Sequence, residues 1–328
     1  MKFKFSGVLS AFLIGFLLVS GAQAGTVRDG SDLAPTGKGW GVEQSNSPSA
    51  AEQGNGISNS PFAVVTGNHI KYHGGPIMPG TVNVYFIWYG NWTNGPKKSD
   101  RPITVQLLES LFGTGGIGGS GYERINTTYG DNASNVTGDI SLAGEYFDSG
   151  SLGKKLTDAK VQTIVSNAIS NNNLPNEANG IYFVLTSSDI SERSGFCSRY
   201  CGWHTNASLA GTDIKYAFVG NSDRCPFSCE MQTVSPNGDS GADGMASIMA
   251  HEAEEALTDP DLNAWYDSTG QESADKCGWM FGPTKLTPSR ARYNQIFDNG
   301  SKWLIQMNWE NTRRGGCDQT LGGFFYSQ

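Results

Sequence analysis

Residues 240–279 read SGADGMASIMAHEAEEALTDPDLNAWYDSTGQESADKCGW, and the rest of the chain is organised around this stretch. Its first half is rich in strong helix formers, with Asp243 as the predicted N-cap. Pro260 disfavours helical backbone at the residue before it. We therefore predict a helix over 244–258, followed by a polar segment that is rich in carboxylates.

This predicted helix carries residues that suit a metal ion. His251 and Glu255 are four residues apart, which places both on one helix face with a Cβ separation of about 5–6 Å. Glu252 takes the place of the general base in the H-E-x-x-H motif of zinc peptidases, whereas Glu255 stands where that motif has its second histidine. We predict His251 and Glu255 as metal ligands, Glu252 as the catalytic base and Zn²⁺ as the cofactor.

A third ligand must come from the segment after the helix. Glu272 is the first choice, because the thermolysin-like zinc peptidases place a carboxylate ligand about twenty residues after the helix histidine. The motif of those peptidases, which the segment resembles loosely, has another acid a few residues further on, and Asp275 stands there. Asp275 and Asp259, which lies one turn past Glu255, are the second choices.

The same residues permit a different interpretation. A solvent-exposed helix rich in glutamate would match H-E-x-x-E by chance if it held one histidine. A histidine with two carboxylates also brings more negative charge to an ion than two histidines with one carboxylate, so a bound water would be less acidic. Additional oxygen ligands favour harder ions such as Ca²⁺ or Mn²⁺. A structural site, a vestigial site or no metal at all therefore remain alternatives at this point.

The N-terminus has the layout of a secretory signal peptide. Lys2 and Lys4 precede an apolar run over 8–19, and an Ala-Gln-Ala sequence over 22–24 provides a cleavage site. The apolar run is shorter than the ~20 residues that a membrane span needs. We predict that residues 1–24 are removed and that the protein is secreted, with no membrane span after cleavage.

The charge of the chain narrows the class of partner. The full sequence has a formal net charge of −8, and removal of the two N-terminal lysines makes it more acidic. Nucleic acids and anionic membrane surfaces favour positively charged proteins, so neither is an expected partner. We expect a partner outside the cell, namely a peptide, a cell-wall component or a receptor.

The exported part of the chain divides into a leader and one domain. Residues 25–60 are rich in Gly, Ser, Asn and Pro and hold a single large aromatic side chain, Trp40. Such a composition buries too little apolar surface to offset the entropy of ordering. We predict a flexible leader or pro-segment over 25–60 and a single globular domain over 61–328.

Patterns within this domain predict an α+β fold, stapled by disulfides, in which helices pack on a mixed sheet. Strands are predicted over 82–89, 180–185, 214–219 and 303–309. Helices are predicted from Asp100 to Phe112 and after Thr157. Turns or loops are predicted over 123–152 and 195–205. A zincin-like core around the helix over 244–258 is the hypothesis that follows from the metal motif.

The cysteines lie in the C-terminal half and are even in number. They are Cys197, Cys201, Cys225, Cys229, Cys277 and Cys317. An even count in an exported chain predicts three disulfides, and we expect the last two cysteines to pair with each other and the first four among themselves. A four-cysteine zinc site is the alternative for those first four.

Several long segments together indicate a family. They are YHGGPIMPGTVNVYFIWYGNW (72–92), FCSRYCGWHT (196–205), YAFVGNS (216–222), CPFSC (225–229), SPNGDSGADGMASIMAHEAEEALTDPDLNAWYD (235–267) and ESADKC (272–277). In these segments the chain resembles the Exordium-like, or phosphate-induced, proteins of plants and their microbial relatives, and the resemblance extends over 61–320.

This resemblance implies an extracellular, apoplastic or cell-wall location and, in plants, an association with growth and brassinosteroid responses. It places His251, Glu252 and Glu255 in the same H-E-x-x-E context but does not supply an enzymatic activity. Two hypotheses follow. The first is a zinc-dependent, peptidase-like hydrolase, and the second is a non-enzymatic binding or growth-signalling protein with a structural or vestigial metal site.

Overall fold

The computed structural model describes residues 27–28, 32–38 and 69–322. The predicted signal peptide over 1–24 and most of the predicted leader lie outside the described residues. Within them, no helix is both long enough and apolar enough to cross a membrane.

A mixed sheet of five strands, in the order β5-β4-β7-β10-β9, forms the centre of the domain. Its strands are β4 (Gly80–Tyr89), β5 (Val136–Asp148), β7 (Gly180–Thr186), β9 (Gly202–Leu209) and β10 (Thr212–Val219). Neighbouring strands are parallel from β5 to β10, and β9 is antiparallel to β10 at the edge. The mixed sheet with packed helices confirms the predicted α+β class.

The remaining elements surround this sheet. The helices are α2 (Pro102–Phe112), α3 (Asp158–Ser170), α4 (Pro226–Cys229) and α5 (Ser240–Thr258), with short 3-10 helices η2 (Glu123–Thr128), η3 (Ser222–Arg224) and η4 (Asp275–Cys277). The short strands are β1 (Val27–Arg28), β2 (Asp32–Leu33), β3 (Lys71–Tyr72), β6 (Lys155–Leu156), β8 (Ser191–Glu192), β11 (Trp265–Tyr266), β12 (Lys285–Leu286), β13 (Arg292–Tyr293), β14 (Gln295–Ile296), β15 (Lys302–Trp303), β16 (Asn308–Glu310) and β17 (Gly316–Asp318).

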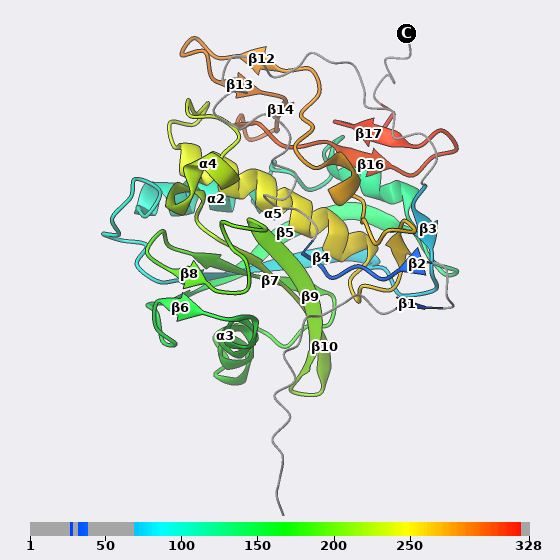
Figure 1. The fold of residues 1–328 in the computed structure, drawn as a ribbon, viewed down its shortest axis with the longest axis horizontal. Helices are drawn as coiled ribbons and strands as arrows, with labels where there is room; N and C mark the ends of the chain where they lie inside the picture. Colours follow the sequence, from blue (N-terminus) through cyan, green and yellow to red (C-terminus); the bar gives the residue numbers. More distant parts are fainter. Residues whose placement is uncertain (1–26, 29–31, 39–68, 323–328) are drawn as a thin grey trace, which may run out of the picture.

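The three central strands are buried because apolar and aromatic residues occupy both of their faces. Val84 of β4 pairs with Ile181 of β7, and Tyr182 of β7 pairs with Tyr216 of β10. Helix α5 lies on one side of the sheet and α3 on the other (Figure 1). These strands confirm the predictions for 82–89, 180–185 and 214–219, and the structure extends each by one or two residues.

Two helix predictions agree with the structure. Helix α2 begins at Pro102 within the predicted span, and Thr157 caps α3 by accepting a hydrogen bond from the Lys160 backbone N–H at 3.4 Å.

The prediction of turns over 123–152 is wrong, because the 3-10 helix η2 and the edge strand β5 together make up most of this stretch. The side chains of β5 alternate between buried residues, such as Val136 and Ile140, and exposed ones, such as Thr137 and Asp139. An edge strand with one solvated face carries many polar residues, and Gly138 and Gly144 further weaken the strand pattern.

Two further predictions of local structure are also wrong. The loop predicted over 195–205 becomes strand from Gly202 onwards, where β9 pairs with β10. The strand predicted over 303–309 is divided between β15 and β16, which belong to different two-stranded ribbons. In both cases the partner strand decides the outcome, and the local sequence does not specify that partner.

Three disulfides confirm the predicted grouping of the cysteines. They join Cys277 to Cys317, Cys197 to Cys225 and Cys201 to Cys229. The last two fix the segment that precedes β9 to the segment around α4. The four-cysteine zinc site is therefore excluded.

Candidate metal centre

Helix α5 begins four residues earlier than predicted. Its N-cap is Asp239, whose side chain accepts a hydrogen bond from the Ala242 backbone N–H at 3.2 Å. The prediction of Asp243 as N-cap is wrong. Asp243 lies inside the first turn, where the Asn237 side-chain amide donates to it at 2.7 Å. Gly and Ser around this turn lower its helix propensity, so the residues with high propensity mark a later start.

Nearly every residue of α5 is buried, including its acidic ones. A helix covered on all sides is usually apolar all round, and the charged side chains of α5 must therefore find partners inside the protein. Glu254 finds them on one face, where Asn308 donates to its carboxylate. His251 and Glu255 meet a different set of residues.

One group of ligand atoms surrounds His251. Its Nε2 lies 3.2 Å from Glu255 Oε1 and 3.5 Å from Asp275 Oδ1. The Asp275 backbone N–H donates to the same Glu255 oxygen at 3.0 Å, which fixes η4 against the helix. On the other side of the ring, the amide nitrogen of Gln306 lies 2.8 Å from His251 Nδ1 and 2.9 Å from the Ala274 carbonyl oxygen. Gln306 thereby holds the orientation of the imidazole.

A second group surrounds His204, which strand β9 presents to the helix. Its Nε2 lies 3.2 Å from Glu272 Oε1 and 3.6 Å from Glu255 Oε2. Glu255 therefore belongs to both groups and offers one oxygen to each histidine. Within each group the possible ligand atoms lie within 4.8 Å of one another.

The predicted ligands are thus distributed over two neighbouring groups. His251 and Glu255 meet, and Asp275 joins them. Glu272 also lies close to Glu255, but in the group of His204. Asp259 is in neither group. Its Oδ1 accepts the backbone N–H groups of Asn263 and Ala264 at 2.6 and 2.5 Å, so it stabilises the turn after α5.

Glu252, the predicted base, lies against strand β9. A Cβ atom at Gly202 would lie 2.8 Å from Glu252 Oε1 and 2.6 Å from Ile248 Cγ2, so the missing side chain at 202 leaves room for the carboxylate. The other oxygen of Glu252 is buried, and so is Glu272 Oε2. Neither atom has a hydrogen-bond partner among the described residues.

Burial and mutual repulsion change the proton affinities of these groups. Burial, followed by Coulombic repulsion from Glu255, raises the pKa of Glu272 well above its usual value. Burial also raises the pKa of Glu252, against an opposing attraction to His251 and with further repulsion from Glu255. Carboxyl groups in this environment hold protons that a cation would displace.

Sequence reasoning missed His204 and Gln306. His204 follows Cys201 by three residues in a segment predicted as a loop, and Gln306 lies in the middle of a segment predicted as a strand. A histidine near a pair of cysteines was the only available signal for His204. Nothing in the sequence around Gln306 marks it as the partner of a histidine.

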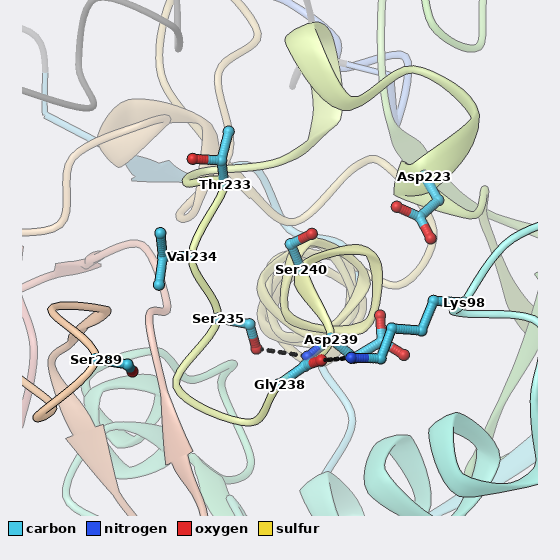
Figure 2. A pocket seen from close by; sticks show the side chains of 9 residues that line it. All are labelled: Lys98, Asp223, Thr233, Val234, Ser235, Gly238, Asp239, Ser240 and Ser289. Carbon is cyan, nitrogen blue, oxygen red and sulfur yellow. Dashed lines mark hydrogen bonds between the residues drawn. The ribbon is translucent and has the colours of Figure 1, made fainter.

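A separate pocket of about 440 Å³ lies at the other end of α5 (Figure 2). The lining residues are Lys98, Asp223, Thr233, Val234, Ser235, Gly238, Asp239, Ser240 and Ser289. Lys98 donates to the Gly238 carbonyl oxygen there. None of its lining residues belongs to the two histidine groups.

Comparisons with known proteins identify a family model and several relatives to which the chain is similar. The family model described as the phosphate-induced protein 1 conserved region matches residues 70–319. The chain is similar to Protein EXORDIUM-like 5 of Arabidopsis thaliana, with 32% identity over 74% of this chain and 75% of that protein. It is 34% identical to Protein EXORDIUM-like 3 of the same plant, over 65% of this chain and 69% of that protein. Its identity to Protein PHOSPHATE-INDUCED 1 of Nicotiana tabacum is 26%, over 72% of this chain and 83% of that protein. No solved structure matches the chain.

Proposed function

The chain belongs to the phosphate-induced protein 1, or Exordium-like, family, and on that premise we propose that it is an exported, metal-dependent hydrolase of the peptidase type. The predicted signal peptide and the three disulfides support export, because disulfides persist in oxidising compartments. The zincin-like core is part of the same proposal. Its support is the position of the H-E-x-x-E helix against the mixed sheet.

One observation carries the proposal: two buried imidazoles and several buried carboxylates converge on Glu255. His204, His251 and Glu255 are each 1% exposed. Buried carboxylate oxygens without a hydrogen-bond partner cost on the order of 1–3 kcal/mol each. A divalent cation between these residues would satisfy Glu272, whose Oε2 has no hydrogen-bond partner among the described residues.

The ligand atoms are compatible with zinc. Each group combines one histidine with two carboxylates, as the predicted set did, but both groups share Glu255. Together they supply two imidazoles and three carboxylates, and mixed nitrogen and oxygen ligands are typical of Zn²⁺. Each group provides three ligand atoms, which leaves a position for water in a tetrahedral site. Glu255 joins the two positions.

Glu252 is the proposed base for the hydrolysis. A divalent ion held by His251, Glu255 and Asp275, or by His204, Glu255 and Glu272, would supply a positive charge that lowers the pKa of nearby water. Glu252 would accept a proton from the attacking water as the water oxygen adds to the acyl carbon. The carboxyl group then gives the proton to the leaving amine as the C–N bond breaks. A raised pKa suits this exchange, because the carboxyl group must both accept and return a proton near neutral pH.

Metal content provides the first test. The purified full chain, without chelator at neutral pH, should hold stoichiometric zinc, and His251→Ala should hold less. Absence of metal from the unaltered protein would remove the basis of the proposal. Digestion of a peptide library then compares the unaltered protein with Glu252→Gln, which should lose about 100-fold or more in rate. Equal cleavage by the two proteins would exclude Glu252 as the base.

The complete burial of the site favours a second candidate function. A non-enzymatic extracellular or cell-wall binding protein with a structural metal would need no access for substrate, and no residue of the two histidine groups is more than 5% exposed. Such a protein would hold zinc and lose stability on chelation. It would cleave no member of the library.

A further inference from the structure

The described part of the leader lies on the outer edge of the sheet. Strand β9 ends the strand order, so its outer backbone groups have no neighbouring strand within the sheet. The Gly37 carbonyl oxygen accepts a hydrogen bond from the His204 backbone N–H at 3.1 Å. Residues 34–38 thus place a segment of chain on the edge of β9, where a peptide could bind to the strand's outer backbone groups. In Figure 1 this segment is the blue trace that continues from β2.

Gly37 fits this position because it has no side chain. Its φ is +66°, in the region that favours glycine. A Cβ atom there would lie 2.0 Å from the His204 carbonyl oxygen, which is far inside contact distance. Pro35 and Gly37 are both buried. The contact is therefore close, and any side chain at position 37 would push the segment off the strand.

The Lys38 ammonium contacts several groups that favour a cation. Its Nζ lies 2.6 Å from Asp158 Oδ2 and 3.2 Å from Ser194 Oγ. The same ammonium lies 5.3 Å from the centre of the Tyr200 ring and 5.2 Å from that of Trp203. A carboxylate, a hydroxyl group and two aromatic rings around one ammonium form a recognised cation-binding arrangement.

This edge is directly connected to the candidate metal centre. The backbone of His204 binds Gly37, and the imidazole of His204 contacts Glu272 and Glu255. Trp203, the preceding residue, points to the opposite face of the sheet because side chains alternate along a strand. A peptide on the edge of β9 therefore lies across a residue of the centre, while its lysine is held on the other face.

We propose that the outer edge of β9 and the groups around the Lys38 ammonium (Asp158, Ser194, Tyr200 and Trp203) form a binding site for a peptide that contains a Gly-Lys pair. Residues 34–38 of the leader occupy this site as an intramolecular competitor. That such a peptide is also the class of substrate rests on the proposed function, whereas the docking of the peptide does not.

The test uses the full chain and a synthetic peptide with the sequence of residues 32–38, Asp-Leu-Ala-Pro-Thr-Gly-Lys. Gly37→Ala should displace the leader through the clash with His204. Gly211→Ala is the matched control, because Gly211 also has a positive φ (+81°) but no atom lies within 4 Å of its added Cβ. Calorimetry or fluorescence should show that Gly37→Ala binds the peptide with an affinity at least about tenfold higher than that of the unaltered protein or of the control. The reason is that the tethered leader competes with the peptide at a high effective concentration in those two proteins.

Hydrogen exchange provides a second measurement. The His204 amide should exchange faster in Gly37→Ala than in the unaltered protein, and the peptide should restore slow exchange. A peptide with alanine in place of its lysine should bind Gly37→Ala about tenfold more weakly. Equal binding by all three proteins, or no binding to Gly37→Ala at millimolar peptide, overturns the proposal.

Zinc content measured on the same samples separates the two proposals. Peptide binding without stoichiometric zinc would refute the metal-dependent function and leave the peptide site in place. Stoichiometric zinc without peptide binding would refute the peptide site and leave the metal-dependent function in place.

Discussion

The two imidazoles of the candidate centre differ in their affinity for a proton. Burial lowers the pKa of His204 to about 4, although Glu255 opposes the shift, so this imidazole is neutral at pH 7. Burial also acts to lower the pKa of His251, but attraction to Glu255 and hydrogen bonds to Asp275 and Glu255 outweigh it and raise the pKa well above its usual value. One histidine is therefore ready to bind a cation, and the other must first lose a proton.

Metal binding should consequently release protons. His251 and Glu272 both have raised pKa values in the metal-free protein, so a cation must displace protons that are still bound at pH 7. The affinity for the metal therefore rises with pH, by about tenfold per pH unit for each proton displaced. Calorimetry in two buffers of different ionisation enthalpy should show release of about one proton or more per ion at pH 7. An affinity that is the same at pH 6 and pH 8 would contradict this prediction.

Glu255 should determine how many ions bind. It presents Oε1 to His251 and Oε2 to His204, so each group would hold an ion through a different oxygen of the same carboxylate. We expect two zinc ions per chain, one in His204→Ala, one in His251→Ala and about none in Glu255→Ala, measured by elemental analysis after gel filtration. One ion in the unaltered protein that is lost in both histidine variants would assign a single shared ion instead. Asp261→Ala is the control, because Asp261 is an acid outside both groups and should leave the count unchanged.

At the scale of single residues, the sequence identifies only those site residues whose spacing along the chain places them on one helix face. His251, Glu252 and Glu255 can be found because four residues make about one helical turn, whatever the surrounding fold. His204 and Gln306 reach the centre from a sheet edge and from a C-terminal segment. Their roles depend on which strand lies beside α5, and spacing along the chain carries no information on that.

Among the elements, α5 packs closely against β9 at Gly202. Gly202→Ala would add a methyl group 2.8 Å from Glu252 Oε1 and 2.6 Å from Ile248 Cγ2. We expect it to lower the free energy of unfolding by about 1–3 kcal/mol, measured by chemical denaturation, and to weaken zinc binding. Gly144→Ala in β5 is the matched control, because a Cβ there makes contacts of 3.4 Å or longer and should leave both quantities nearly unchanged. Equal losses in the two variants would argue against a specific role for the α5–β9 contact.

Sequence patterns predicted the elements that are buried on both faces. The strands β4, β7 and β10 have continuous apolar runs, which identify them without knowledge of their neighbours. Both edge strands were missed. β5 mixes polar with apolar residues, and β9 begins within a cysteine-rich segment that resembles a loop. The position of an edge strand is decided by pairing, so it requires the fold to be known.

For the whole molecule, the disulfide between Cys277 and Cys317 connects stability to the candidate centre. Cys277 ends η4, the short helix that begins at Asp275. Replacement of both cysteines by alanine should lower the free energy of unfolding by about 2–5 kcal/mol. It should also weaken zinc binding, because Asp275 loses its anchor.

The matched control removes the disulfide between Cys197 and Cys225, which does not hold η4. Its loss should reduce stability by a similar amount and leave zinc affinity unchanged. If removal of either disulfide weakened zinc binding equally, the effect would reflect general loosening of the domain. Thermal unfolding and competition with a chromophoric chelator measure the two quantities.

The contact between the leader and β9 also sets an order of events during synthesis. Lys38 and Asp158 are separated by 120 residues, so the leader emerges long before its partners exist. The edge that receives Gly37 forms only after β9 has been made and has paired with β10. A contact between segments as distant in the sequence as Gly37 and β9 forms late. The leader is therefore among the first described segments to be made and among the last to find its place. The leader therefore docks on β9 only in a chain whose sheet has already formed.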